Sequence, residues 1–336
     1  MNMRKWLDDL RTAERKKALP VLSFPSVSLM GITVRELIAD SGLQAEGMKR
    51  IADRVDSAAS VSMMDLSVEA EAFGAEIRIS DDEVPTVTKA VVYSEADADA
   101  LAVPPVGAGR TGRYVEAIEK ACGLITDRPV FAGVIGPFSL AGRLMDVTET
   151  LIYCYTEPDM VHKTMRKCTA FLKEYISAYK EQTGAGGVVI AEPLTGLLSP
   201  DMAAEFSEPY VKEIVDAVQD DAFLVIYHNC GDNTIQMVDS ILRTGAAAYH
   251  FGNAIDMQEM LAHIPKGIAV MGNVDPAGQF CNGTPASIRE KTLEIMEACC
   301  PDYPNFVISS GCDIPPASSW ENIDAFFGAV AEYYGR

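Results

Sequence analysis

Short apolar segments recur along this chain, and amphipathic helical segments fill the intervals between them. Each apolar segment is rich in Val, Ile, Phe and Ala and ends in Gly, Pro, Asn or Asp, as buried parallel strands do. Strands that alternate with helices in this way build a parallel sheet. The predicted strands are Pro20–Phe24, Ser60–Met64, Val130–Ile135, Gly187–Ala191, Phe223–Tyr227, Ala247–Phe251, Ile268–Met271 and Phe306–Ser310.

This alternation predicts an α/β fold, a (β/α)8 TIM barrel. An open doubly wound sheet is the alternative, but no G-x-G-x-x-G follows a strand, which disfavours a dinucleotide-binding fold. We expect residues 1–336 to form a single domain, with an N-terminal helical cap over roughly residues 1–19. The long connection between the second and third strands predicts an insertion over roughly residues 66–128, which would either carry function or cap the barrel.

The charge balance excludes one class of partner. With 48 acidic and 28 basic residues, the chain has a formal net charge of −20, which is unsuited to nucleic-acid phosphates. No apolar run is long enough to predict a membrane span. The first residues are charged and lack the apolar run of a secretory leader, so we expect a cytoplasmic protein.

Two of the eight cysteines stand at the ends of predicted strands. In a long chain without a secretory leader, cysteines indicate buried thiols, metal ligands or catalytic thiols rather than disulfides. Cys230 follows the fifth strand, two positions after His228, and Cys312 follows the eighth strand. Residues i and i+2 of an extended segment point the same way, and all strand ends of a barrel line one mouth. The three residues therefore predict a Zn²⁺ site with an open fourth position, as catalytic zinc has.

Other polar groups stand at the same strand ends. Glu192, after the fourth strand, could complete the zinc shell, hold a substrate group or form a salt bridge. His250 ends the sixth strand and either faces the mouth or packs in the wall. Asn273 and Asp275 follow the seventh strand and are candidates for contacts to a cofactor or to the metal ligands. Asn-x-Asp-Pro is equally typical of a turn with an Asx hydrogen bond.

Several motifs together resemble the uroporphyrinogen decarboxylase superfamily, and within it the corrinoid-dependent methyltransferases of methylcobamide:coenzyme M type. The His-x-Cys with a distant Cys is the specific part of the likeness, because it forms the zinc site of those methyltransferases. The matching segments are MDLSVEAE at 64–71, GVIGPF at 133–138, EPLTGLLSP at 192–200, HNCGD at 228–232, GNVDP at 272–276 and GCDIP at 311–315.

The resemblance implies a zinc-dependent methyltransferase of one-carbon metabolism. His228, Cys230 and Cys312 would hold the ion, and Glu192 could occupy the fourth position until a thiol displaces it. A small thiol such as coenzyme M would take the methyl group from a methylated corrinoid. The chain lacks the Asp-x-His-x-x-Gly signature of corrinoid modules, so the corrinoid would arrive on a separate corrinoid-binding protein. Asn273, Asp275 and His250 are the residues expected to contact it.

One departure and several alternatives remain. Decarboxylases of the superfamily carry arginines after the first strand, whereas this chain reads FPSVSLM at 24–30, which disfavours decarboxylation. A small methyl donor could replace the corrinoid, or the protein could bind zinc or corrinoid without turnover. A sulfonated thiol needs a cationic partner, for which Arg110, Arg113 and Lys89 are candidates.

Overall fold

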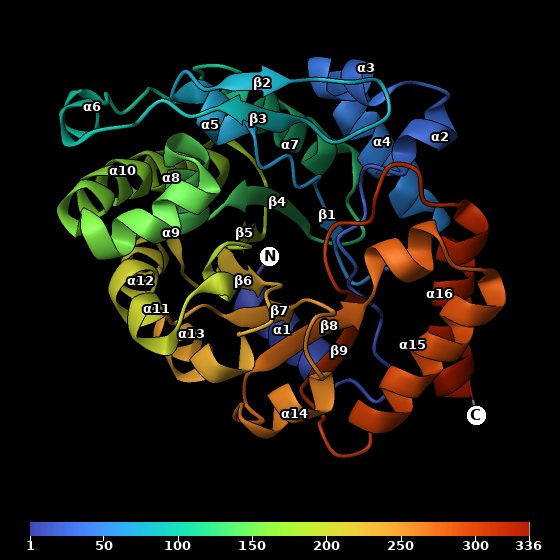
Figure 1. The fold of residues 1–336 in the computed structure, drawn as a ribbon. Helices are drawn as coiled ribbons and strands as arrows, with labels where there is room; N and C mark the ends of the chain where they lie inside the picture. The colour runs from blue at the N-terminus through green and yellow to red at the C-terminus, as the bar shows by residue number, and fades with distance from the viewer. Residues whose placement is uncertain (336) are drawn as a thin grey trace.

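The computed structural model describes residues 1–335 and has a seven-stranded parallel sheet at its centre (Figure 1). The strands follow one another in the order β1-β4-β5-β6-β7-β8-β9. This half-barrel sheet confirms the α/β class and is compatible with a TIM-like barrel. Its strands are β1 (Ser60–Val61), β4 (Val130–Ile135), β5 (Gly187–Ala191), β6 (Leu224–Asn229), β7 (Ala248–Phe251), β8 (Ala269–Val274) and β9 (Phe306–Ser310).

Seven of the eight predicted strands are confirmed, and the prediction of a strand at Pro20–Phe24 is wrong. Proline has no N–H to donate to a ladder, and the chain turns at Phe24 into helix α2 (Ser26–Met30). The segment before it still lies between the two edges of the sheet. Leu19 donates its N–H to the carbonyl of Ile308 in β9 at 3.1 Å, and Ala18 accepts one from Ala58, just before β1, at 2.8 Å. Isolated hydrogen bonds therefore join the two edges in place of an eighth ladder.

Helix α1 (Met3–Thr12) covers the amino ends of the strands. Met3, Leu7 and Leu10 recur at helical spacing and are buried in one apolar cluster with inward-facing strand residues such as Phe131 and Leu224. The N–H of Met3 donates to the carbonyl of Asp221, just before β6, at 2.7 Å. Figure 1 shows α1 behind the strands, within the ring of outer helices.

The outer helices pack their apolar faces on the outside of the sheet and form the larger core cluster. α10 begins at Pro158 after the capped end of α9, and α15 begins with Thr284 as its cap and Pro285 in its first turn. The outer helices are α4 (Ser41–Arg54), α7 (Thr111–Leu124), α10 (Pro158–Gln182), α11 (Pro200–Phe206), α12 (Glu208–Val218), α13 (Val238–Arg243), α14 (Met257–Ala262), α15 (Pro285–Cys299) and α16 (Trp320–Gly335).

The remaining elements lie in the connections. Between β1 and β4 the chain forms α5 (Val68–Ala72), an antiparallel pair of β2 (Glu76–Arg78) with β3 (Thr86–Lys89), α6 (Glu95–Ala100) and then α7. Figure 1 shows the β2–β3 pair at the top, apart from the central sheet. Two helices follow β4, namely α8 (Pro137–Met145) and α9 (Val147–Thr156), and α3 (Val34–Ala39) precedes α4.

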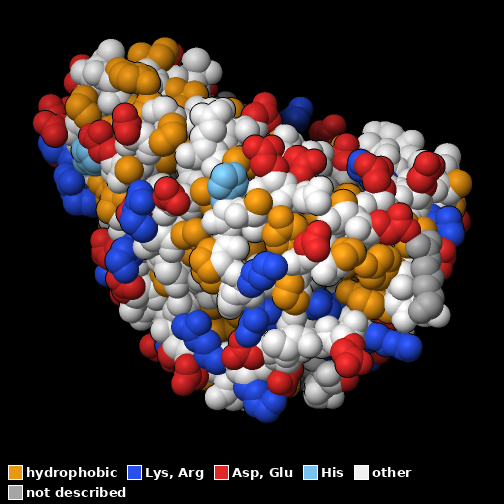
Figure 2. Space-filling view, turned by 90° about the horizontal axis from the view of Figure 1, so that it is seen from below, with side chains coloured by type: hydrophobic (Ala, Val, Ile, Leu, Met, Phe, Trp, Pro, Cys, Tyr) orange, Lys and Arg blue, Asp and Glu red, His pale blue; other side chains and the backbone are white. Residues whose placement is uncertain are grey.

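Acidic and basic side chains are interspersed on the surface. Figure 2 shows one face of the molecule, where carboxylates stand among lysines and arginines without a continuous basic stripe. No helix in residues 1–335 combines the length and the apolar character needed to cross a bilayer.

Candidate metal centre

Three side chains from two distant strand ends meet at the carboxyl edge of the sheet. His228 lies near the end of β6, Cys230 follows that strand, and Cys312 follows β9. Each offers a ligand atom, and these atoms all lie within 4.8 Å of one another. We call these three residues the metal group. The sequence predicts this convergence, because parallel strands of a curved sheet direct their carboxyl ends to one rim.

The free nitrogen of His228 can be identified from the hydrogen bonds behind it. Ser309 donates its hydroxyl proton to the carbonyl of Leu19 at 2.7 Å, so its oxygen accepts the Nε2–H of His250 at 2.8 Å. His250 Nδ1 is therefore unprotonated and accepts a hydrogen bond. It lies 2.7 Å from His228 Nδ1, so His228 Nδ1 must be the protonated donor of this pair. His228 Nε2 is left with a free lone pair and is buried without a nitrogen or oxygen partner among the described residues 1–335.

The two thiols are coupled to each other. A hydrogen bond from Cys312 lowers the pKa of the Cys230 thiol. The same contact, together with burial, raises the pKa of the Cys312 thiol to about 12. An imidazole lone pair and two thiols that release protons on binding are the donor set that Zn²⁺ prefers. The residues present therefore fit this ion.

The loop after β6 is shaped by close backbone packing. A Cβ on Gly231 would overlap the Cα of Gly196, and one on Gly252 would overlap the Cβ of Cys230. The side-chain Oδ1 of Asn229 accepts the N–H of Gly231 at 3.1 Å, and its Nδ2 donates to Thr195 Oγ1 at 2.7 Å. These contacts fix the backbone on both sides of Cys230. The sequence HNCGD at 228–232 contains the asparagine and the glycine, but the sequence does not reveal that they pack against residues 195 and 196.

Glu192 lies beside this group at the end of β5. It is fully buried, and its carboxylate accepts the N–H groups of Phe138 and Ser139 at 2.9 Å each and the Ser139 hydroxyl at 2.6 Å. Its own N–H donates to the carbonyl of His228 at 2.9 Å. Burial raises its pKa to about 7. The structure thus seats Glu192 on the first turn of α8, and the group of converging ligand atoms does not include it.

The three residues expected to contact a cofactor have protein partners. His250 is the wall residue behind His228 described above. Asn273 donates to the carbonyls of Gly252 and Ile255 at 2.9 and 3.0 Å. Asp275 accepts the N–H groups of two residues that follow it, at 3.0 and 2.9 Å, which is the Asx turn that the sequence allows. Asn273 and Asp275 also line a pocket of about 290 Å³ beside α15, which no member of the metal group lines.

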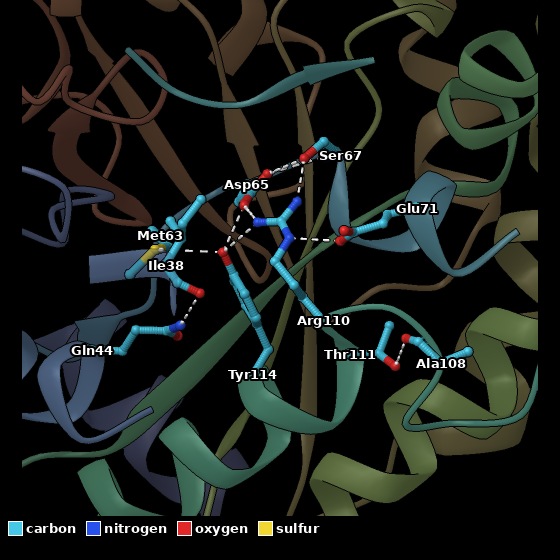
Figure 3. Close-up of polar contacts among 10 residues, drawn as sticks. All are labelled: Ile38, Gln44, Met63, Asp65, Ser67, Glu71, Ala108, Arg110, Thr111 and Tyr114. Carbon is cyan, nitrogen blue, oxygen red and sulfur yellow. Dashed lines mark hydrogen bonds and ion pairs between the residues drawn. The ribbon is translucent and has the colours of Figure 1, made fainter. Parts of the chain in front are cut away.

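Arg110, one of the cationic candidates, is already paired. Figure 3 shows its guanidinium between Asp65, Ser67 and Glu71, with the Tyr114 hydroxyl beside Asp65. It forms an ion pair with Asp65, another with Glu71 at 2.6 Å and a hydrogen bond to Ser67 at 2.8 Å. Arg110 is 5% exposed, so little of it can meet a ligand.

The other two candidates lie outside the metal group. Lys89, in β3, pairs with Glu76 at 3.3 Å on the surface, and Arg113 lies half-buried on α7.

Comparison with known proteins places this chain in a family. The uroporphyrinogen decarboxylase (URO-D) family model matches residues 25–333. The chain is 26% identical over 277 residues to methylcobamide:CoM methyltransferase MtbA of Methanosarcina acetivorans, covering 80% of this chain and 78% of the relative. It is 28% identical over 249 residues to uroporphyrinogen decarboxylase of Chlorobium luteolum, covering 71% and 68%. A solved structure of a methyltransferase from Methanosarcina mazei shares the fold, with a TM-score of 0.86, 22% identity and 99% of both chains covered.

Proposed function

This chain belongs to the uroporphyrinogen decarboxylase family, and on that premise we propose that it is a zinc-dependent methyltransferase that moves a methyl group from a methylated corrinoid to a small thiol. The observation that carries the proposal is the meeting of the free Nε2 of His228 with the thiols of Cys230 and Cys312. The relatives named as methylcobamide:CoM methyltransferases support the reaction class. A single barrel domain, with residues 66–128 as an insertion, would carry the site.

In this proposal His228 Nε2 and the two cysteine sulfurs hold Zn²⁺. When bound, the ion supplies positive charge that keeps an incoming thiol deprotonated and nucleophilic at neutral pH. Ser309 and His250 keep the proton of His228 on Nδ1, so that Nε2 stays available. Three ligands leave a position open for substrate.

Glu192 could occupy the fourth position in the absence of substrate. Its Oε1 accepts one N–H from α8 and keeps a second lone pair for the ion, whereas Oε2 already accepts the N–H and the hydroxyl of Ser139. A thiol that enters would displace it.

The proposed methyl transfer needs no oxidant, reductant or other reactant. The substrate sulfur attacks the methyl carbon, and the carbon–cobalt bond breaks with its electron pair on cobalt, which passes from Co(III) to Co(I). The proton of the thiol leaves to solvent, and a thioether is released. The methylated corrinoid would come on a separate corrinoid-binding protein, with Asn273 and Asp275 as its proposed contacts. His250, the third expected contact, is buried behind His228 and uses both ring nitrogens within the protein, so its proposed role is to position His228 instead.

The test is demethylation of free methylcobalamin by an added thiol, with the reaction monitored by the change in corrinoid absorbance. We expect about one zinc per chain, and Cys312→Ser should lose both the zinc and the reaction. Cys281→Ser is the matched control, because Cys281 is also half-buried but lies outside the metal group. Metal-free wild-type protein from zinc-replete medium would refute the proposal.

Decarboxylation is the competing activity, because part of the family carries that name. It predicts release of carbon dioxide from a porphyrinogen and indifference to chelators. If the protein binds zinc tightly but shows no turnover with any thiol, it is a non-catalytic zinc-binding protein. If it demethylates a small methyl donor, that donor takes the place of the corrinoid in the reaction.

A further inference from the structure

Arg143 is a cation without a partner. It lies on α8, its Nε atom is buried, and its guanidinium makes no hydrogen bond and no ion pair within residues 1–335. A guanidinium stays charged at any physiological pH, so burying it unpaired is costly. Burial lowers the pKa of Arg143, which reflects the same cost. Arg143 as a whole is half-buried, so an anionic ligand that entered beside it would offset that cost.

The free guanidinium faces a small pocket. Arg143 lines a space of about 170 Å³ with residues of the β1–α5 connection and of the segment leading into β3. The walls are mainly apolar, from Met64, Leu66, Val84, Pro85 and Val87, with Ser67 and Thr86 as the other polar members. An apolar pocket with one charged group suits a short organic anion.

Two chains of contacts connect this pocket with the metal centre. Ser139 stands one helical turn before Arg143 on the same face of α8 and binds the Glu192 carboxylate. On the other side, Met64 lines the pocket and donates its N–H to Asp313 at 2.9 Å. Asp313 directly follows Cys312. The pocket therefore lies along the same carboxyl edge as the three metal-capable residues.

Two acids of the segment from Asp65 to Glu71 pair with Arg110 and not with Arg143. Asp65 and Glu71 both pair with Arg110, as Figure 3 shows. Ser67 links the two arginines, because it binds Arg110 and also lines the pocket of Arg143. The Arg110 contacts hold this wall in place, and Arg143 is left free to meet a ligand.

We propose that Arg143 binds the anionic end of the thiol substrate and thereby selects and orients it. The inference rests on the proposed methyl transfer to a thiol. The anionic end would be a carboxylate or a sulfonate, both of which accept hydrogen bonds from the guanidinium fork. The thiol end would then reach the metal centre. Arg143 is a specificity residue in this scheme, because the reacting atoms lie at the other end of the substrate.

The test compares thiols of similar size and different charge. Zinc-loaded protein is given methylcobalamin with 2-mercaptoethanesulfonate, 3-mercaptopropionate, 2-mercaptoethanol or cysteamine. Wild type should have a KM about 10- to 100-fold lower for the two anionic thiols than for mercaptoethanol. Arg143→Met should lose that preference while its kcat with mercaptoethanol stays within about twofold of wild type. Arg143→Lys should keep part of the preference.

Arg78→Met is the control, because Arg78 is an exposed arginine of the neighbouring β2–β3 pair. Equilibrium binding of the same thiols separates this inference from the proposed function. If no thiol reacts but 2-mercaptoethanesulfonate binds wild type more tightly than Arg143→Met, the proposed methyl transfer is refuted and anion binding by Arg143 is supported. If Arg143→Met keeps the anionic preference, or weakens all four thiols equally, the inference is overturned.

Discussion

Glu69 makes the stability of this protein depend on pH in an unusual direction. Its side chain is 2% exposed, Oε1 accepts the N–H of Ile135 at 3.0 Å, and Oε2 has no partner within residues 1–335. Burial, with a smaller contribution from nearby Asp65, raises its pKa to about 8. The folded protein therefore binds a proton at Glu69 more tightly than the unfolded chain does.

The sign and the size of the effect follow from that shift. A raised carboxyl pKa adds stability that is fully present below the unfolded value of about 4.5 and is lost as the pH rises through about 8. At about 1.4 kcal/mol per pH unit, the whole window corresponds to about 5 kcal/mol. Between pH values of about 6 and about 9 the loss is about 3 kcal/mol.

Glu69→Gln keeps the shape of the side chain and removes its titration. We expect the free energy of unfolding of the variant, relative to wild type, to increase by about 3 kcal/mol from pH ~6 to pH ~9. Urea unfolding followed by circular dichroism at both pH values measures this difference. Glu119→Gln, on the exposed face of α7, should show no such change. A difference between Glu69→Gln and wild type that is the same at both pH values would refute the reasoning.

Two further predictions concern the metal centre. Ser309→Ala removes the group that accepts the His250 Nε2–H, so the tautomer of His228 is no longer fixed, and zinc affinity measured against a competing chelator should fall about 10- to 100-fold. Gly231→Ala places a methyl group against Gly196 and should lower the zinc content of a folded protein, whereas Gly123→Ala, which has open space, should leave it unchanged. Normal zinc content in Gly231→Ala would show that the loop yields to the methyl group.

Seven strands and the convergence of the three candidate metal ligands could be predicted from the sequence alone. Val130–Ile135 and Phe306–Ser310 were identified to the residue, because buried parallel strands read as continuous apolar runs. His228, Cys230 and Cys312 could be brought together because strand ends of a parallel sheet share one edge.

What the sequence could not reveal are contacts that depend on three-dimensional packing. The free nitrogen of His228 depends on Ser309 and on the carbonyl of Leu19, which is 290 positions from Ser309. Whether an arginine is paired is equally invisible in a sequence: the candidate cation Arg110 is paired, whereas Arg143, which no motif marks, has no ion pair or hydrogen bond within residues 1–335. Pro20–Phe24 has the composition of a strand, but the missing proline N–H and the following turn prevent one.

The hydrogen bonds between the two sheet edges can form only late in synthesis, because their partners lie at opposite ends of the chain. Val21 binds the hydroxyl of Ser310, 289 positions later, and Leu19 binds Ile308. A ribosome adding about 5–20 residues per second needs about 15–60 seconds to make the chain between them. Throughout that interval the edge beside β1 has no partner from β9, so the nascent sheet offers unpaired backbone groups to other chains. This edge is therefore covered only after β9, the last strand to emerge, has been made.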